Sequence, residues 1–164
     1  MSNISMTTSK RNAIVTVMLI SAFVSMLNQT ILNTALPAII KGLNITETTA
    51  QWLITGFMLV NGIMIPLTAF LMDKYSTRHL YIFSMAIFLI GSIVAAFSPT
   101  FSILMISRII QAIGAGILLP LMQFTVFTLF PAEQRGFAMG LAGVVVQSAP
   151  AIGPTLTGLF VDLF

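Results

Sequence analysis

Five long runs of apolar residues follow one another along the 164-residue chain, and short polar stretches separate them. A helix that crosses a bilayer needs about 20 mostly apolar residues, because its backbone groups must all be hydrogen-bonded internally. The pattern therefore predicts an all-α membrane protein with about five transmembrane helices. The predicted spans are residues 13–36, 52–72, 80–97, 101–130 and 137–160.

Prolines mark three of the predicted breaks between spans, at Pro37, Pro99 and Pro131. A proline lacks the backbone N–H that a helix interior needs, so a break is where it costs least. The longest predicted loop covers residues 38–50, which is too short to bury a core of its own. We therefore expect the function of this chain to lie among its helices.

The composition agrees with a membrane protein and excludes a soluble enzyme. Hydrophobic residues make up 57% of the chain and charged residues 7%, and the mean hydropathy is +1.04. Soluble domains carry about 25% charged residues, which they need to cover a water-facing surface. One arginine and a few amides within the spans are also too few for a membrane-embedded catalytic site. The expected partner is the lipid bilayer.

The net charge of +3 does not indicate a nucleic-acid partner, because no basic run is longer than Lys10-Arg11. The chain has no cysteine and a single histidine, His79. A thiolate or histidine-cluster metal site is therefore excluded, and no bound cofactor is expected.

The distribution of basic residues predicts the orientation in the membrane. If the N-terminus is cytoplasmic, the inner side carries five of them: Lys10, Arg11, Lys74, Arg78 and Arg135. The outer side then carries Lys41 between its spans, which fits the excess of positive charge found in cytoplasmic loops. The chain is thus predicted to cross the cell membrane several times. Residues 1–12 are predicted to be its cytoplasmic N-terminus, and residues 13–164 a partial transmembrane bundle.

Arg108 breaks the hydrophobic pattern about two turns into the fourth span. An arginine at the middle of a membrane costs about 2.5–3.5 kcal/mol even on lenient scales. Either it faces the protein interior for a function, or its long side chain reaches back to the interface. Gln111 lies three residues later on the same helix face, which favours the interior.

Polar residues also gather in the outer half of the first span, at Asn28, Gln29 and Asn33. They either line a water-filled cavity or bond to neighbouring helices, and the sequence favours neither. The fifth span is rich in residues that bend or thin a helix, with Pro154 between Gly153 and Gly158. Close helix packing is expected there, and at two further sets of small residues: Gly136 with Gly140, and Ala112 with Gly114 and Gly116.

Four segments together resemble the major facilitator superfamily, in particular its fourteen-span drug:proton antiporter branch. They are LNQTILNTALPAI at Leu27–Ile39, AFLMDKYSTR at Ala69–Arg78, RIIQAIGAG at Arg108–Gly116 and GPTLTG at Gly153–Gly158. The first segment departs from that branch at Asn28, where an aspartate is usual. The resemblance implies an incomplete N-terminal helical bundle of a transporter with two six-helix bundles and two extra spans. The chain is then either a fragment or a truncated gene product.

The resemblance also implies roles for particular residues. Proton coupling would involve Arg108 and Gln111, and the cytoplasmic gate Asp73, Lys74 and Arg78. Sliding between the two bundles would involve Gly153, Pro154 and Gly158, and the cavity would be lined by Asn28, Gln29 and Asn33.

The function implied is proton-driven export of small amphipathic or cationic substrates by alternating access, with the proton gradient as the energy source. The predicted spans contain no acidic residue. The acid that exchanges protons is therefore expected in the missing downstream helices. Two alternatives remain: a transporter of the same fold that carries a metabolite or lipid, and a truncated remnant that does not transport.

Overall fold

The computed structural model describes residues 7–163, and of residue 156 and residues 159–163 it describes the backbone alone. Five helices account for nearly all of it: α1 (Thr8–Leu43), α2 (Glu47–Lys74), α3 (Thr77–Ala96), α4 (Phe101–Leu129) and α5 (Ala132–Leu163). Each of these helices is long and apolar enough to cross a membrane. The prediction of an all-α protein with five transmembrane helices is confirmed.

The predicted break at Pro37 is wrong, because α1 continues through this residue to Leu43. The predicted loop of residues 38–50 shrinks to the three residues 44–46. Asn44 makes the turn with a left-handed φ of 50°, and its N–H bonds to the carbonyl of Ile40. Membrane helices tolerate an internal proline, because neighbouring groups satisfy the carbonyl that it frees. Pro99 and Pro131 do lie between helices, as predicted.

The predicted cytoplasmic N-terminus, residues 1–12, overlaps the first turn of α1. Residues 8–12 already belong to α1, while residues 1–6 lie outside the part of the chain that is described.

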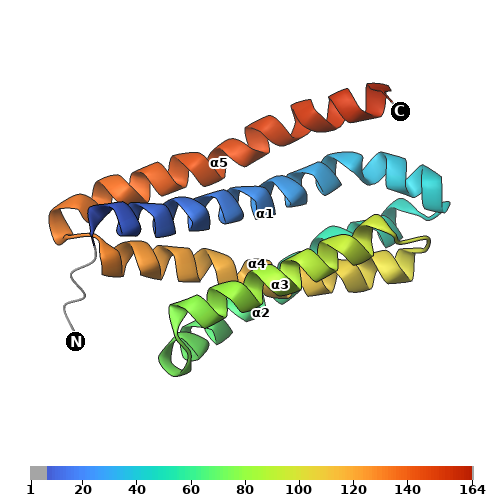
Figure 1. Ribbon diagram of the computed structural model, residues 1–164. Coiled ribbons are helices and arrows are strands. Elements are labelled where there is room, and N and C mark those ends of the chain that lie inside the picture. Colours follow the sequence, from blue (N-terminus) through green and yellow to red (C-terminus); the bar gives the residue numbers. More distant parts are fainter. Residues whose placement is uncertain (1–6, 164) are drawn as a thin grey trace.

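Helix α4 lies at the centre of the bundle, with α1 and α5 on one side and α2 and α3 on the other (Figure 1). It buries more of its surface than the other described helices. Its residues Ile117 and Leu121 pack with Met18 of α1, Met64 of α2 and Val146 of α5. A polar residue on this helix is therefore well placed to lie away from lipid.

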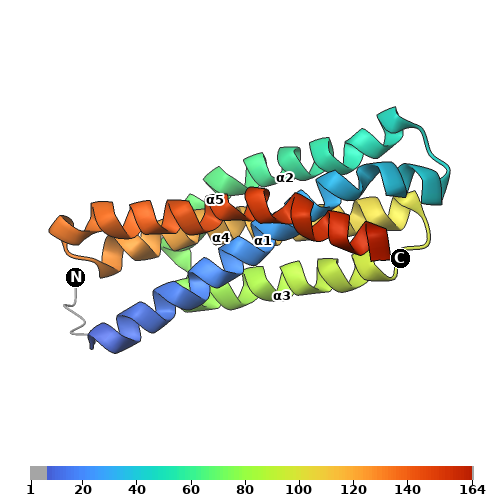
Figure 2. The ribbon, with the colours of Figure 1, turned by 90° about the horizontal axis from the view of Figure 1, so that it is seen from above.

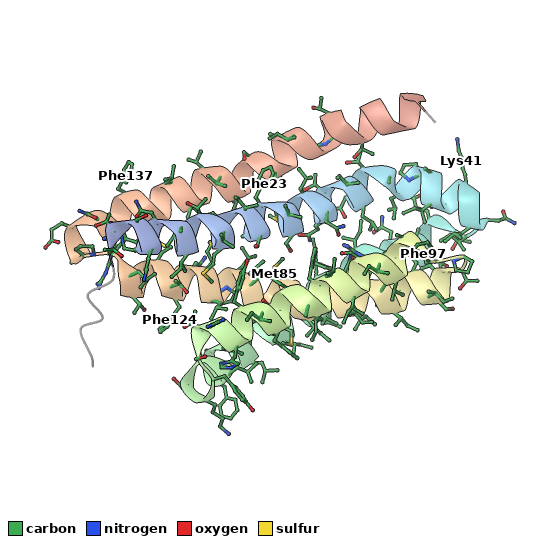
Figure 3. The ribbon with its side chains drawn as sticks, in the orientation of Figure 1. Phe23, Lys41, Met85, Phe97, Phe124 and Phe137 are labelled. Carbon is green, nitrogen blue, oxygen red and sulfur yellow. The ribbon has the colours of Figure 1, made fainter. Side chains whose placement is uncertain are left out.

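The helices alternate in direction, so the basic residues sort by bundle end. Lys41 lies at the end where α1 finishes, as Figure 3 shows. The other end carries five basic residues, namely Lys10, Arg11, Lys74, Arg78 and Arg135. Helix length and turn position thus place the charges at the two interfaces.

Candidate functional site

Arg108 lies in the interior of the bundle and does not extend back to the interface. Its side chain is 0% exposed, at a point on α4 where α1, α2 and α3 all pass close by. Its Cζ atom lies 4.3 Å from the centroid of the Phe57 ring on α2, a cation–π contact. The site is thus built around a charge that is sealed from lipid.

Two carboxamides hold the Arg108 guanidinium. Nη1 donates to Oε1 of Gln111 at 2.8 Å and to Oδ1 of Asn28 at 3.3 Å. Gln111 in turn donates from Nε2 to Oγ of Ser92 at 3.0 Å. The network therefore joins α4 to α1 on one side and to α3 on the other.

A glycine on α3 makes the contact with Ser92 sterically feasible. A Cβ atom on Gly91 would lie 2.9 Å from the backbone N of Gln111 and 3.0 Å from the carbonyl of Ser107. Only a residue without a side chain lets the two backbones approach so closely. Sequence reasoning missed both Gly91 and Ser92, because a glycine and a serine in an apolar helix are common and carry no distinctive spacing.

The positive charge of Arg108 is not matched by its described neighbours. Asn28 and Gln111 are neutral, and Nε and Nη2 have no hydrogen-bond partner within the described part of the chain. An unmatched buried charge is costly, and a guanidinium suits a carboxylate through two parallel bonds. The arrangement can therefore stabilise a carboxylate that comes from outside these residues.

The other predicted cavity-lining residues lie apart from this cluster. Gln29 is half-buried and Asn33 is exposed, and neither has a described hydrogen bond to Arg108. Asn28 is the member of the predicted set that the fold brings to the arginine. Cavity lining by Gln29 and Asn33 stays a prediction.

The predicted gate residues surround the turn between α2 and α3. Asp73, Lys74 and Arg78 are all exposed, and Nζ of Lys74 lies 4.4 Å from the centroid of the Phe70 ring. Arg78 stands at the wall of a cavity of about 720 Å³ between α1, α3 and α4. The α2–α3 turn diverges from the other helices at this end (Figure 1). The gate role stays a prediction.

The residues predicted to lie between two bundles, Gly153, Pro154 and Gly158, differ in their surroundings. A Cβ atom on Gly153 would lie 2.6 Å from Cγ2 of Thr30, so this glycine lets α5 pack on α1 inside the bundle. Pro154 and Gly158 are exposed, and no described atom lies within 4 Å of a Cβ placed on Gly158. Of the three, Pro154 and Gly158 are free to meet another surface.

The expected close packing is observed for the small residues of α4, whereas for those at the start of α5 it stays a prediction. A Cβ atom on Gly114 would lie 2.6 Å from the carbonyl oxygen of Ser84. A Cβ atom on Gly136 or Gly140 would meet no described atom within 4 Å. The spacing of small residues does not specify which helix face meets a neighbour.

Comparison with known proteins places the chain in a family. Residues 18–164 match the model of the Major Facilitator Superfamily. The chain is 54% identical over 154 residues to the uncharacterized MFS-type transporter YcnB of Bacillus subtilis, covering 94% of this chain and 33% of that protein. It is 45% identical over 145 residues to the lincomycin resistance protein LmrB of Bacillus subtilis, covering 88% of this chain and 30% of that protein.

A more distant relative points the same way. The chain is 34% identical over 145 residues to the probable multidrug resistance protein EmrY of Escherichia coli, covering 88% of this chain and 28% of that protein. The chain thus spans about a third of the length of these relatives. Since the family model covers most of its residues, the chain belongs to the Major Facilitator Superfamily, whose members are membrane transporters and not enzymes.

Proposed function

We propose that this chain forms most of the first helical bundle of a proton-coupled exporter of small amphipathic or cationic molecules. Two relatives support export of drugs, since one is named a lincomycin resistance protein and another a probable multidrug resistance protein. The apolar cavity of about 720 Å³ at one bundle end is in the size range of small-molecule sites, about 300–1,000 Å³.

The buried, unmatched charge of Arg108 is the observation that carries the proposal of proton coupling. Its guanidinium keeps Nε and Nη2 free of described partners. An ionised carboxylate on a helix of the downstream part would pair with these atoms, and protonation would release it. Two states of the bundle would then differ by one ion pair, which lets the proton gradient bias them. Asn28 is neutral, so it cannot itself be the group that gains and loses the proton.

The orientation that we propose places the N-terminus in the cytoplasm. Five basic residues lie at the bundle end where α1 begins, and Lys41 lies at the other end. The apolar cavity opens at the same end as the five. An opening towards the cytoplasm is what an exporter needs in order to admit its substrate from inside.

The test uses the complete transporter in everted membrane vesicles, with ethidium or lincomycin as substrate. Arg108→Ala is expected to lower accumulation driven by a pH gradient by about 5- to 150-fold, since coupling free energies of 1–3 kcal/mol are typical. Substrate counterflow without a gradient should persist, because binding does not need the proton. Lys41→Ala removes an exposed charge and serves as the matched control. Unchanged gradient-driven export by Arg108→Ala would remove Arg108 from the mechanism.

A further inference from the structure

Two arginines at the basic end of the bundle are held differently from the other bases there. Arg11 of α1 and Arg135 of α5 are half-buried, whereas Lys10, Lys74 and Arg78 are exposed. Charged side chains at a membrane interface normally extend into water, so their partial burial needs a reason.

Both arginines contact Phe130, the residue that directly follows α4. The Cζ atom of Arg11 lies 4.4 Å from the centroid of the Phe130 ring. Nε of Arg135 donates to the backbone carbonyl of Phe130 at 3.0 Å. Arg11 thus contacts the ring of Phe130 and Arg135 its backbone carbonyl, so the ends of three helices bring two positive charges to one residue.

The contacts described for this pair include no carboxylate. The remaining one joins Nε of Arg11 to Oδ1 of Asn12 at 3.4 Å. The sequence before Arg11 contains no acidic residue, and Glu133 near the start of α5 is exposed. Two like charges without a counterion repel each other, and an anion bound beside both would relieve that repulsion.

A groove that is partly lined by Phe130, the residue that both arginines contact, runs between α1 and α5. These helices diverge towards the end where α1 begins, as Figure 2 shows. The groove measures about 250 Å³. Most of its lining is apolar, from Val15, Leu19, Phe130, Phe137, Ala138 and Leu141, and Asn12 and Thr16 add polar atoms. Phe137 projects from α5 with 77% of its surface exposed (Figure 3). A ligand that uses both features would combine an anionic group with an apolar chain.

We propose that this groove is a binding site for one anionic phospholipid. The phosphate lies beside Arg11 and Arg135, and an acyl chain follows the groove past Leu19 and Leu141. Guanidinium groups match phosphate oxygens with paired hydrogen bonds, and basic pockets between transmembrane helices are typical sites for anionic lipids. The phosphate would sit at headgroup depth, because both arginines lie in the first turns of their helices. The site does not depend on the proposed transport reaction or on the orientation.

The test is native mass spectrometry of the complete transporter in mixed micelles with equal amounts of phosphatidylglycerol and phosphatidylcholine. The wild-type protein is expected to retain one phosphatidylglycerol and little phosphatidylcholine. The double variant Arg11→Gln with Arg135→Gln should lower retained phosphatidylglycerol by at least about tenfold, because charge-assisted bonds in a partly buried site are strong. Lys10→Gln removes one exposed charge beside Arg11 and should change retention by less than about threefold.

Two further variants separate the headgroup site from the acyl groove and from folding. Phe137→Ala keeps both arginines and, being at an exposed position, should leave the fold intact. It is expected to weaken retention of long-chain but not of six-carbon phosphatidylglycerol. Arg135→Gln alone replaces the double variant if the latter does not elute as a single species. Equal loss with Lys10→Gln, equal retention of phosphatidylcholine, or no effect of the arginine variants would each overturn the proposal.

Discussion

At the scale of single residues, Arg108 combines complete burial with neutral partners. Its charge and the three-residue spacing to Gln111 are visible in the sequence, and the spacing favoured an interior position. Asn28 joins them from 80 residues away, and Ser92 supports Gln111 from another helix. Those two contacts depend on how α1 and α3 pack on α4, which no local pattern specifies.

The Gln111 bridge makes a testable contribution to stability. Gln111→Leu removes the 2.8 Å acceptor of Arg108 and leaves Ser92 without its donor. Hydrogen bonds to charged groups contribute about 1.5–3 kcal/mol, so a clear fall in the Tm of the purified complete transporter is expected. Gln123→Leu makes the same change at an exposed position of α4 and should leave the Tm nearly unchanged. Equal Tm values for the two variants would contradict the structural role of Gln111.

At the scale of helices, α4 is central because small residues let its neighbours approach. Gly114 faces the backbone of α3, while Gly116 faces Met64 and Asn61 of α2. The GxxxG spacing of Gly136 and Gly140 looked equivalent in sequence, yet no described atom packs on either. Small-residue spacing shows where close packing is sterically feasible, and the neighbouring helix determines whether it occurs.

Alanine substitutions at matched glycines test this difference. In Gly114→Ala the new Cβ would lie 2.6 Å from the Ser84 carbonyl and 2.9 Å from the Phe88 backbone N, so α3 must move. Overpacking of this kind costs typically about 1–3 kcal/mol, and a lower Tm is expected. Gly140→Ala meets no described atom and should gain up to about 1 kcal/mol from helix propensity. Opposite signs in thermal unfolding would support the packing, and a tolerated Gly114→Ala would contradict it.

At the scale of the whole molecule, the described chain has two distinct ends. One end carries five basic residues, the apolar cavity of about 720 Å³ and the groove between α1 and α5. The other holds the short turn at Asn44 and the single base Lys41. Charge asymmetry of this size is typical of a defined orientation in the membrane.

Cysteine labelling tests that orientation, because the chain contains no cysteine of its own. Ser9→Cys and Gly42→Cys place single thiols at exposed positions of opposite ends, in a complete transporter whose other cysteines are replaced. With a cytoplasmic N-terminus, a membrane-impermeant maleimide should label Gly42→Cys in intact cells and label Ser9→Cys after permeabilisation. The reverse pattern would place the N-terminus outside.

The amino-acid pattern alone was enough to predict the class of this protein and most of its helices. Long apolar runs have one stable solution in a bilayer, because every backbone polar group must be hydrogen-bonded within a helix. It also marked Arg108, since a charge in such a run is costly wherever it lies. It misplaced the end of α1, because Pro37 is tolerated inside a membrane helix.

Which residues of different helices contact each other became visible only in the folded bundle. The pairing of Arg108 with Asn28 and the convergence of Arg11 and Arg135 on Phe130 each join different helices. So does the contact of Gly153 with Thr30. In a membrane, apolar faces are solvated by lipid about as well as by other helices, so hydrophobic pattern does not select partners. Close packing and a few polar contacts select them, and both depend on the three-dimensional arrangement.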